Sequence, residues 1–281
     1  MAAANNYNRQ TEDVGNILAL EHVNFTTPDQ SLATFFYVNG LGFTRDPYVD
    51  FGPFNVWINV GNQQFHLPTG KPQVLRGHVG LYVPDLEGLA QRLDRIGRRL
   101  ADTRFEYQVR KQHILVTCPW GNKIKCFAGS KNMRLGMAYV ELDVPTENIP
   151  GIARFYQQIF GSPVTMGKNT CEVAIGREQV LRFKGSRKLP EYDGHHIAIY
   201  TVDFSSPYEQ LKKRKLIIEE SDQHQYRFSR IVDPDSGDFL FELEHEVRSL
   251  RHPMFSRKLV NRNANQSFFN YVQGRDAYYP N

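Results

Sequence analysis

Residues 18–44, LALEHVNFTTPDQSLATFFYVNGLGFT, return in altered form as residues 135–164, LGMAYVELDVPTENIPGIARFYQQIFGSPV. Each copy predicts an alternating strand, a turn rich in Thr, Pro and Asp, and a helix that ends in an aromatic pair and a glycine. Gly42 and Gly161 stand where the helix ends and the chain turns into a strand. A repeat of this kind predicts two copies of one structural unit.

Two further pairs of segments extend the repeat. GHVGLYVPDLEGLAQRL from Gly77 matches HHIAIYTVDFSSPYEQL from His195, and each predicts a strand that runs into a helix. CPWGNKIKCF from Cys118 matches DPDSGDFLFEL from Asp233, and each predicts a tight turn before a last strand. We therefore expect two domains, over residues 17–129 and 135–247, and a C-terminal tail over 248–281 that packs on them.

The composition is that of a soluble globular protein, with 41% hydrophobic and 23% charged residues among 281. No stretch approaches the roughly 20 apolar residues that span a bilayer, and the first residues lack the apolar segment of a secretory signal. The three cysteines have no CxxC spacing, which argues against a disulfide framework or a thiolate zinc site. Lys and Arg are spread along the chain, so we expect a cytoplasmic protein without a nucleic-acid or membrane partner.

The order of these motifs resembles that of the vicinal oxygen chelate superfamily of glyoxalases, bleomycin-resistance proteins and extradiol dioxygenases. The resemblance rests on a His-x-x-Phe strand, a Phe-Tyr…Gly helix end, a His-[VI]-x-[LI]-Tyr strand and an Asp-Pro-Asp…Gly…Glu closing turn, and covers about residues 17–247. It implies an α+β fold of two tandem glyoxalase-like domains. Each domain would consist of paired βαβββ modules that form a curved antiparallel sheet, with helices on the convex face and a small-molecule site in the cup.

Strand alternation selects the side chains that face each cup, because successive residues of a strand point to opposite faces. The superfamily places metal ligands on the first, fourth, fifth and last strands of a domain. In the first half these positions carry His22, His66, His78 and Lys125. Three neutral imidazoles suit a divalent transition metal such as iron or zinc, whereas a lysine replaces the carboxylate expected at the last position. We predict that the three histidines share one metal, in a cup also lined by Trp57, Tyr82 and Lys125.

In the second half the same positions carry Tyr139, Arg182, His196 and Glu242. The histidine and the last glutamate match the dioxygenase pattern, but the first histidine is absent. We expect Arg182 to pair with Glu242 in a metal-free cup, with His196 beside them. The candidate catalytic residues of this half are His196, Glu242, Tyr200 and Tyr139, and its candidate cup-lining residues are Glu141 and Arg182.

The resemblance implies an enzyme that uses a metal to bind a small oxygenated substrate, such as a catechol-like compound. Extradiol ring cleavage is the nearest reaction by layout, followed by a glyoxalase-type isomerase or lyase reaction. The alternative is a metal-free protein that sequesters a small aromatic ligand, as bleomycin-resistance proteins do. No organic cofactor is expected. The sequence identifies neither the substrate nor the metal, and it does not distinguish a monomer from a homo-oligomer.

Overall fold

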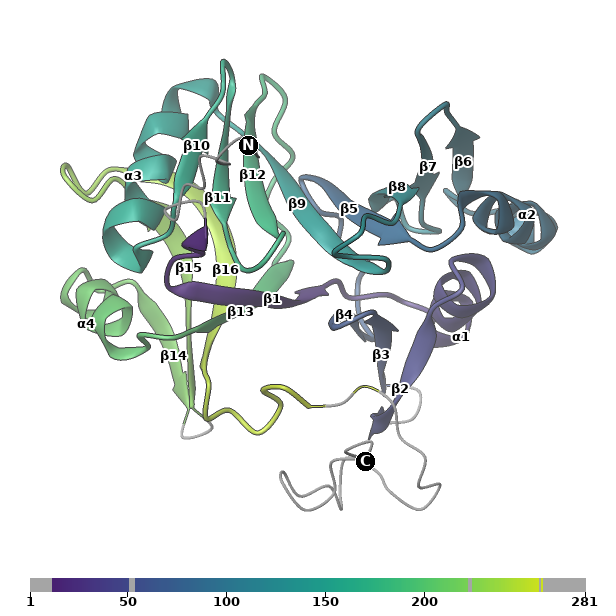
Figure 1. Ribbon diagram of the computed structural model, residues 1–281, viewed down its shortest axis with the longest axis horizontal. Helices are drawn as coiled ribbons and strands as arrows, with labels where there is room; N and C mark the ends of the chain where they lie inside the picture. Colours follow the sequence, from purple (N-terminus) through teal and green to yellow (C-terminus); the bar gives the residue numbers. More distant parts are fainter. Residues whose placement is uncertain (1–11, 51–53, 222–223, 258, 260–281) are drawn as a thin grey trace, which may run out of the picture.

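Four βαβββ modules build the chain in the computed structural model, which describes residues 12–50, 54–221, 224–257 and 259. They assemble into two eight-stranded sheets, each made of two modules (Figure 1). The predicted α+β class and the paired-module architecture are therefore confirmed. Within the described ranges, no helix is both long enough and apolar enough to cross a membrane.

The first sheet joins modules 1 and 4 in the strand order β14-β15-β16-β13-β1-β4-β3-β2. Module 1 comprises β1 (Ile17–Asn24), α1 (Gln30–Thr34), the π-helical turn η2 (Phe35–Gly40), β2 (Thr44–Asp50), β3 (Asn55–Val60) and β4 (Gln63–Pro68). Module 4 comprises β13 (His196–Thr201), α4 (Ser205–Lys213), β14 (Ile217–Ser221), β15 (Gln225–Val232) and β16 (Phe239–Ser249).

The second sheet joins modules 2 and 3 in the order β10-β11-β12-β9-β5-β8-β7-β6. Module 2 comprises β5 (Gly77–Val83), α2 (Leu86–Gly97), the short η4 (Arg98–Leu100), β6 (Glu106–Val109), β7 (His113–Thr117) and β8 (Lys123–Ala128). Module 3 comprises β9 (Gly136–Val144), η5 (Thr146–Asn148), α3 (Ile149–Phe160), β10 (Val164–Met166), β11 (Thr170–Ala174) and β12 (Val180–Gly185).

The pairing of modules differs from the expectation that consecutive modules share a sheet. Strand β1 pairs with β13, and β5 pairs with β9, so each sheet takes one module from each half of the chain. The sheets are also mixed rather than wholly antiparallel, because the first and last strands of every module pair in parallel. Each cup therefore contains residues from both halves of the sequence.

The helices, by contrast, pack within each half. In the first half, the Arg99 guanidinium lies 4.3 Å from the centre of the Phe35 ring, and Phe36 contacts Phe105. In the second half, the Phe155 ring of α3 lies 5.8 Å from that of Phe228 on β15. Helix α3 ends at Gly161, whose φ of 59° is the left-handed conformation predicted at this position. Each half thus has an apolar core under its helices, while the opposite sheet faces remain available for the cups.

A buried histidine in the core of the second half gives the fold a pH dependence. Burial lowers the pKa of His245 to about 3; its Nε2 lies 2.6 Å from the Tyr156 hydroxyl, and its Nδ1 donates to the Leu243 carbonyl. The unfolded chain, with an ordinary histidine pKa near 6.5, binds a proton that the folded chain excludes between these two values. Stability is therefore lost as the pH falls from about 6.5 toward 3.

We expect His245 alone to account for about 2 kcal/mol of the stability lost between pH 6.5 and pH 5. Urea unfolding at a series of pH values measures this loss. The variant His245→Leu should show a shallower pH dependence, whatever its stability at pH 7. The partly exposed His113 offers a graded control: burial and the nearby Lys125 and Arg110 also lower its pKa, but His113→Leu should change the pH dependence much less than His245→Leu. An unchanged slope in His245→Leu would refute the assignment.

Candidate metal centre

Three histidines of the first sheet converge on its helix-free face. His22 lies on β1, His66 on β4 and His196 on β13, and their potential ligand atoms all lie within 4.8 Å of one another. The prediction that His78 completes this set is wrong, because β5 belongs to the second sheet. His196 takes its place, because β13 pairs directly with β1 and places Asn24 opposite His196.

The hydrogen bonding of the ring nitrogens in this cluster shows whether the site fits a metal. His22 Nε2, His66 Nδ1 and His196 Nε2 are buried and have no hydrogen-bond partner among the described residues. Such orphaned buried polar atoms are rare in folded proteins and call for an explanation. Three imidazole nitrogens that converge in this way are the donor set of a divalent transition metal. The residues therefore fit a metal ion.

The opposite nitrogens of two rings are held by neighbouring side chains. His22 Nδ1 donates to the Glu21 carboxylate at 3.2 Å, which leaves the Nε2 lone pair available. His66 Nε2 lies 2.9 Å from Asn55 Nδ2, while Asn55 Oδ1 has no hydrogen-bond partner among the described residues. Rotation of this amide by 180° would let Oδ1 accept Nε2–H and leave the His66 Nδ1 lone pair available. Such partners fix the tautomer and orientation of metal-binding histidines.

The histidines of the cluster are neutral at physiological pH. Burial lowers the pKa of His196 to about 4 and places the pKa values of His22 and His66 well below 6.5. Mutual repulsion of the three imidazolium forms acts in the same direction. A metal would therefore meet three deprotonated ligands without having to displace protons near pH 7.

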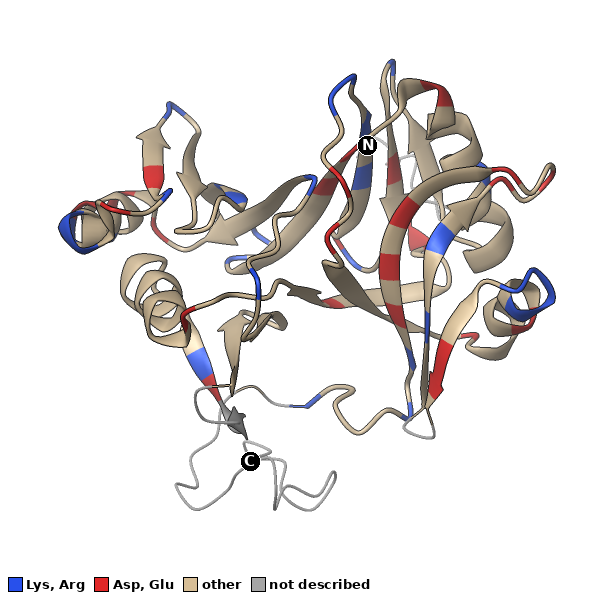
Figure 2. Cartoon of the chain, turned by 180° about the vertical axis from the view of Figure 1, so that it is seen from behind, with Lys and Arg blue, Asp and Glu red and all other residues tan. Residues whose placement is uncertain are grey.

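A carboxylate stands beside the histidines, at a different residue from the one predicted. Glu246 Oε2 lies 3.9 Å from His196 Nε2, and Glu244 lies directly opposite His196 in the register of β13 and β16. Glu242 points to the cup face, as strand alternation predicts, but it lies further along β16 from the histidines and pairs with Arg230. Figure 2 shows acidic residues at intervals along β16. The last-strand carboxylate of this cup is therefore Glu246 rather than Glu242.

Two arginines hold Glu246 in place. Arg227 Nη2 on β15 lies 2.5 Å from Glu246 Oε2, and Arg248 forms ion pairs with both Glu246 and Glu21. Burial opposes ionisation of Glu246, but Arg248 and the other nearby cations outweigh it, so the pKa of Glu246 is below its usual value. The carboxylate remains charged and available at neutral pH.

Aromatic side chains complete the wall of this cup. The Trp57 indole stacks on His66 with 3.9 Å between ring centres and an angle of 15°. The Tyr200 hydroxyl donates to Glu21, the carboxylate that holds His22, at 3.1 Å. Trp57 and Tyr200, which were predicted for different cups, therefore lie beside the histidines of the same cup.

A cavity of about 1030 Å³ adjoins the centre on the side of Glu21 and Gln64. The segment after β16 lines part of this cavity, and its Phe255 ring lies 5.0 Å from that of Tyr200. Arg257 forms a buried ion pair with Asp46 of β2 at 2.6 Å. The start of the tail predicted over 248–281 therefore packs against the first sheet, and its residues 258 and 260–281 lie outside the described residues.

The second sheet carries different chemistry at the matching positions. His78 Nε2 lies 2.8 Å from the Tyr139 hydroxyl, and Arg182 Nε contacts Glu172 at 2.7 Å. The predicted Arg182–Glu242 pair is wrong, because the two residues lie in different sheets; Arg182 Nη1 contacts Glu141 at 3.3 Å instead. Tyr139 likewise belongs with His78 and not with His196.

The strand registers make the correspondence between the cups explicit. Asn24 pairs with both His196 and His66 in the first sheet, as Glu141 pairs with both His78 and Arg182 in the second. The other positions follow from the same registers. His22 corresponds to Tyr139, His66 to Arg182, His196 to His78, and Glu246 to Lys125. The second cup therefore retains a single imidazole and no carboxylate at the matching last-strand position, so its donor set does not fit a metal.

Solved structures with the same architecture place the fold among known ones. A candidate dioxygenase from Bacillus subtilis superposes with a TM-score of 0.58 over 95% of this chain and 93% of its own, at 13% identity. Glyoxalase I from Zea mays superposes with a TM-score of 0.59 over 82% of this chain and 92% of its own, at 16% identity. The chain has the vicinal oxygen chelate fold. At this level of identity, the likeness of that fold to these enzymes concerns architecture alone.

The sequences of known proteins add no closer relationship. No protein-family model matches the chain, and no curated protein matches it significantly. The functional residues that sequence reasoning missed are Glu246, Arg227 and Arg248. Glu246 shares its parity with Glu242 along Glu242-Leu-Glu-His-Glu246, so alternation alone predicted a cup-facing carboxylate in this strand but not which of the three it is.

Proposed function

We propose that this protein is a metal-dependent enzyme that acts on a small organic substrate through two neighbouring oxygen atoms. The observation that carries the proposal is the set of three buried, unpartnered imidazole nitrogens of His22, His66 and His196. Their first-sheet positions match the ligand positions of the vicinal oxygen chelate superfamily. A bound divalent metal would supply a Lewis acid, or an oxygen-activating centre if it is iron.

The side chains around the centre have separate tasks in this proposal. His22, His66 and His196 would hold the metal, with Glu246 as the fourth donor. Glu21 and Asn55 keep the first two rings in the required orientation, and Arg227 and Arg248 restrain the carboxylate. These contacts pre-organise the site before a ligand enters, which is the arrangement that supports catalysis.

The walls of the cup indicate the size and character of the substrate. The Trp57 indole and the Tyr200 ring lie on the strands that flank those of His22 and His66, and both rings are almost completely buried. A planar, oxygenated compound such as a catechol would contact such walls while its oxygens face the metal. We therefore place ring-cleaving dioxygenase chemistry first, with a glyoxalase-type reaction at the same donor set as the second candidate.

Turnover by metal-loaded protein tests this proposal. Metal-free protein is loaded with Fe²⁺ under nitrogen and assayed for oxygen consumption with catechol. In parallel, protein loaded with Zn²⁺ or Ni²⁺ is assayed for the glyoxalase I reaction. We expect turnover in one of the assays, and its loss in His66→Ala but not in the matched variant His78→Ala. Absence of turnover in both assays, with metal shown to be bound, would contradict the proposed reactions.

A further inference from the structure

The last strand of the second cup carries positive side chains where the last strand of the first cup carries negative ones. Where β16 presents Glu244 and Glu246, strand β8 presents Lys123 and Lys125 at the corresponding register positions. The carboxylates beside the proposed metal position of the first cup are thereby replaced by cations that belong to the protein itself. A ligand oxygen that would meet a metal in the first cup would meet ammonium groups in the second.

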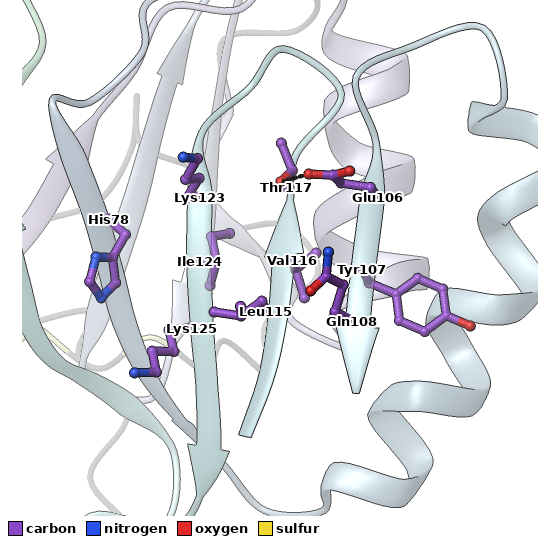
Figure 3. Close-up of a pocket in the computed structure, with 10 residues that line it drawn as sticks. All are labelled: His78, Glu106, Tyr107, Gln108, Leu115, Val116, Thr117, Lys123, Ile124 and Lys125. Atoms are coloured by element: carbon purple, nitrogen blue, oxygen red, sulfur yellow. Dashed lines mark hydrogen bonds between the residues drawn. The ribbon is translucent and has the colours of Figure 1, made fainter. Parts of the chain in front are cut away.

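A cavity of about 300 Å³ lies on this face of β5, β8, β7 and β6 (Figure 3). In Figure 3 the ammonium ends of Lys123 and Lys125 extend from β8 toward the β5 side, where His78 lies. Leu115 of β7 stands next to Lys125 in the register and is 37% exposed. The cavity therefore combines two cations with an accessible apolar floor.

The two lysines form no close ion pair, although Asp143 attracts Lys123 at longer range. Within the ranges that the structure describes, no carboxylate oxygen lies within 4.0 Å of either ammonium group. The nearest acidic side chain of the cavity floor, Glu106, accepts a hydrogen bond from Thr117 at 3.2 Å. Across the sheet, Glu141 is shared between Arg182 and Lys184. Two ammonium groups that have no ion-pair partner among the described residues favour an anionic ligand.

A glycine in β5 shapes the wall of the same cup. A Cβ on Gly80 would lie 2.0 Å from the Tyr139 ring, so only glycine lets this ring lie across the strand. The Tyr139 hydroxyl then meets His78 Nε2 at 2.8 Å, and the Arg182 guanidinium lies 4.4 Å from the ring centre. The wall opposite the lysines is therefore a fixed aromatic and polar surface.

We propose that the second cup is a separate, metal-free binding site for a small organic carboxylate. The carboxylate would face Lys123 and Lys125, and the apolar body of the ligand would cover Leu115, with Thr117 and Gln108 as hydrogen-bonding neighbours. The volume lies at the lower end of the range for small-molecule sites. The small volume of the cavity, and Glu106 in its lining, disfavour a polyphosphate or nucleic acid. This proposal does not depend on the chemistry of the first cup.

Calorimetric titration with benzoate tests the site. The full chain is used after removal of metal by a chelator, both as wild type and as His66→Ala, so that the first cup cannot capture the carboxylate through a metal. We expect one benzoate per chain in both proteins, and at least tenfold weaker binding of benzamide, which has the same shape without the charge. Lys123→Gln and Lys125→Gln should each raise the Kd about tenfold, since a charged hydrogen bond contributes more than 1.4 kcal/mol.

Two controls make the result decisive. Lys213→Gln removes the same charge from the exposed end of α4 and should leave the Kd unchanged. Equal binding of benzoate and benzamide, an unchanged Kd in both cup variants, or absence of benzoate binding up to about 10 mM would overturn the proposal. Binding that disappears in His66→Ala would also overturn it, because the ligand would then occupy the first cup. None of these outcomes depends on turnover at the first cup.

Discussion

Replacing His196 by alanine is expected to weaken metal binding by at least about a hundredfold, whereas His78→Ala leaves it unchanged. Substitution of residues that merely support metal ligands already costs about 10- to 100-fold in affinity, and His196 is a proposed ligand itself. Its Nε2 is buried, unpartnered among the described residues and 3.9 Å from Glu246. His78 lies in the other sheet, with its Nε2 bound to Tyr139.

Competition between the protein and a chromophoric chelator for Zn²⁺ measures this difference. Circular dichroism shows whether each variant is folded, because a loss of affinity is informative only in a folded protein. The comparison of the two histidines is the decisive control, since both occupy the same place in equivalent strands. Equal loss of affinity in the two variants would contradict the assignment of the first sheet as the metal-binding one.

Replacing Arg257 by methionine is expected to destabilise the protein by about 3–5 kcal/mol, the usual cost of removing one partner of a buried ion pair. Arg257 Nη2 lies 2.6 Å from Asp46 Oδ2, and both side chains are almost completely buried, at 1% and 0% exposure. The same carboxylate accepts a hydrogen bond from Gln64, which sits beside His22 in the sheet. The pair therefore ties the start of the C-terminal tail to the wall of the first cup.

Urea unfolding at pH 7 measures this effect. Arg251→Met, which removes an exposed arginine from the same segment, should change the free energy of unfolding by less than about 0.5 kcal/mol. The double variant Asp46→Asn with Arg257→Met should recover part of the loss, because it removes the buried charges of both partners together. A single variant as stable as the wild type would show that the ion pair does not hold the tail in solution.

The module itself was predictable because its determinants are local. Residues 22–24 of β1 alternate between cup and core, and a left-handed glycine ends the helix at Gly161. These signals depend on neighbours within a few residues, and the repeat gives each signal twice. The α+β class and the four βαβββ modules follow from them.

The pairing of modules was not predictable, because no local pattern encodes it. Strand β1 has an apolar helix-facing side and a polar cup side whether its neighbour is β5 or β13. The matching segments His78-Val-Gly-Leu-Tyr82 and His196-Ile-Ala-Ile-Tyr200 could each complete a sheet with β1. Strand alternation correctly predicted that these histidines face the cups. Long-range packing decided that His196, and not His78, joins His22 and His66.

The position of the last-strand carboxylate was ambiguous for a related reason. Strand β16 carries glutamates at every second position from Glu242 to Glu246, all with the same parity. The choice among them depends on the register against β13, which pairs Ala198 with Glu246. The pairing of β15 with β16 is irregular between the closing turn and Glu246. Because the two halves of the sequence were aligned at this turn, the alignment selected Glu242 instead of Glu246.

Anomalous X-ray scattering from crystals of the metal-loaded protein tests the central claim most directly. Data collected on both sides of the zinc absorption edge identify the ion and its position together. We predict one zinc per chain, bound by His22 Nε2, His66 Nδ1 and His196 Nε2 at roughly 2.0–2.1 Å, with Glu246 in the fourth position. An ion held by His78 in the second sheet, or a first cup without zinc in crystals grown at saturating metal, would contradict it.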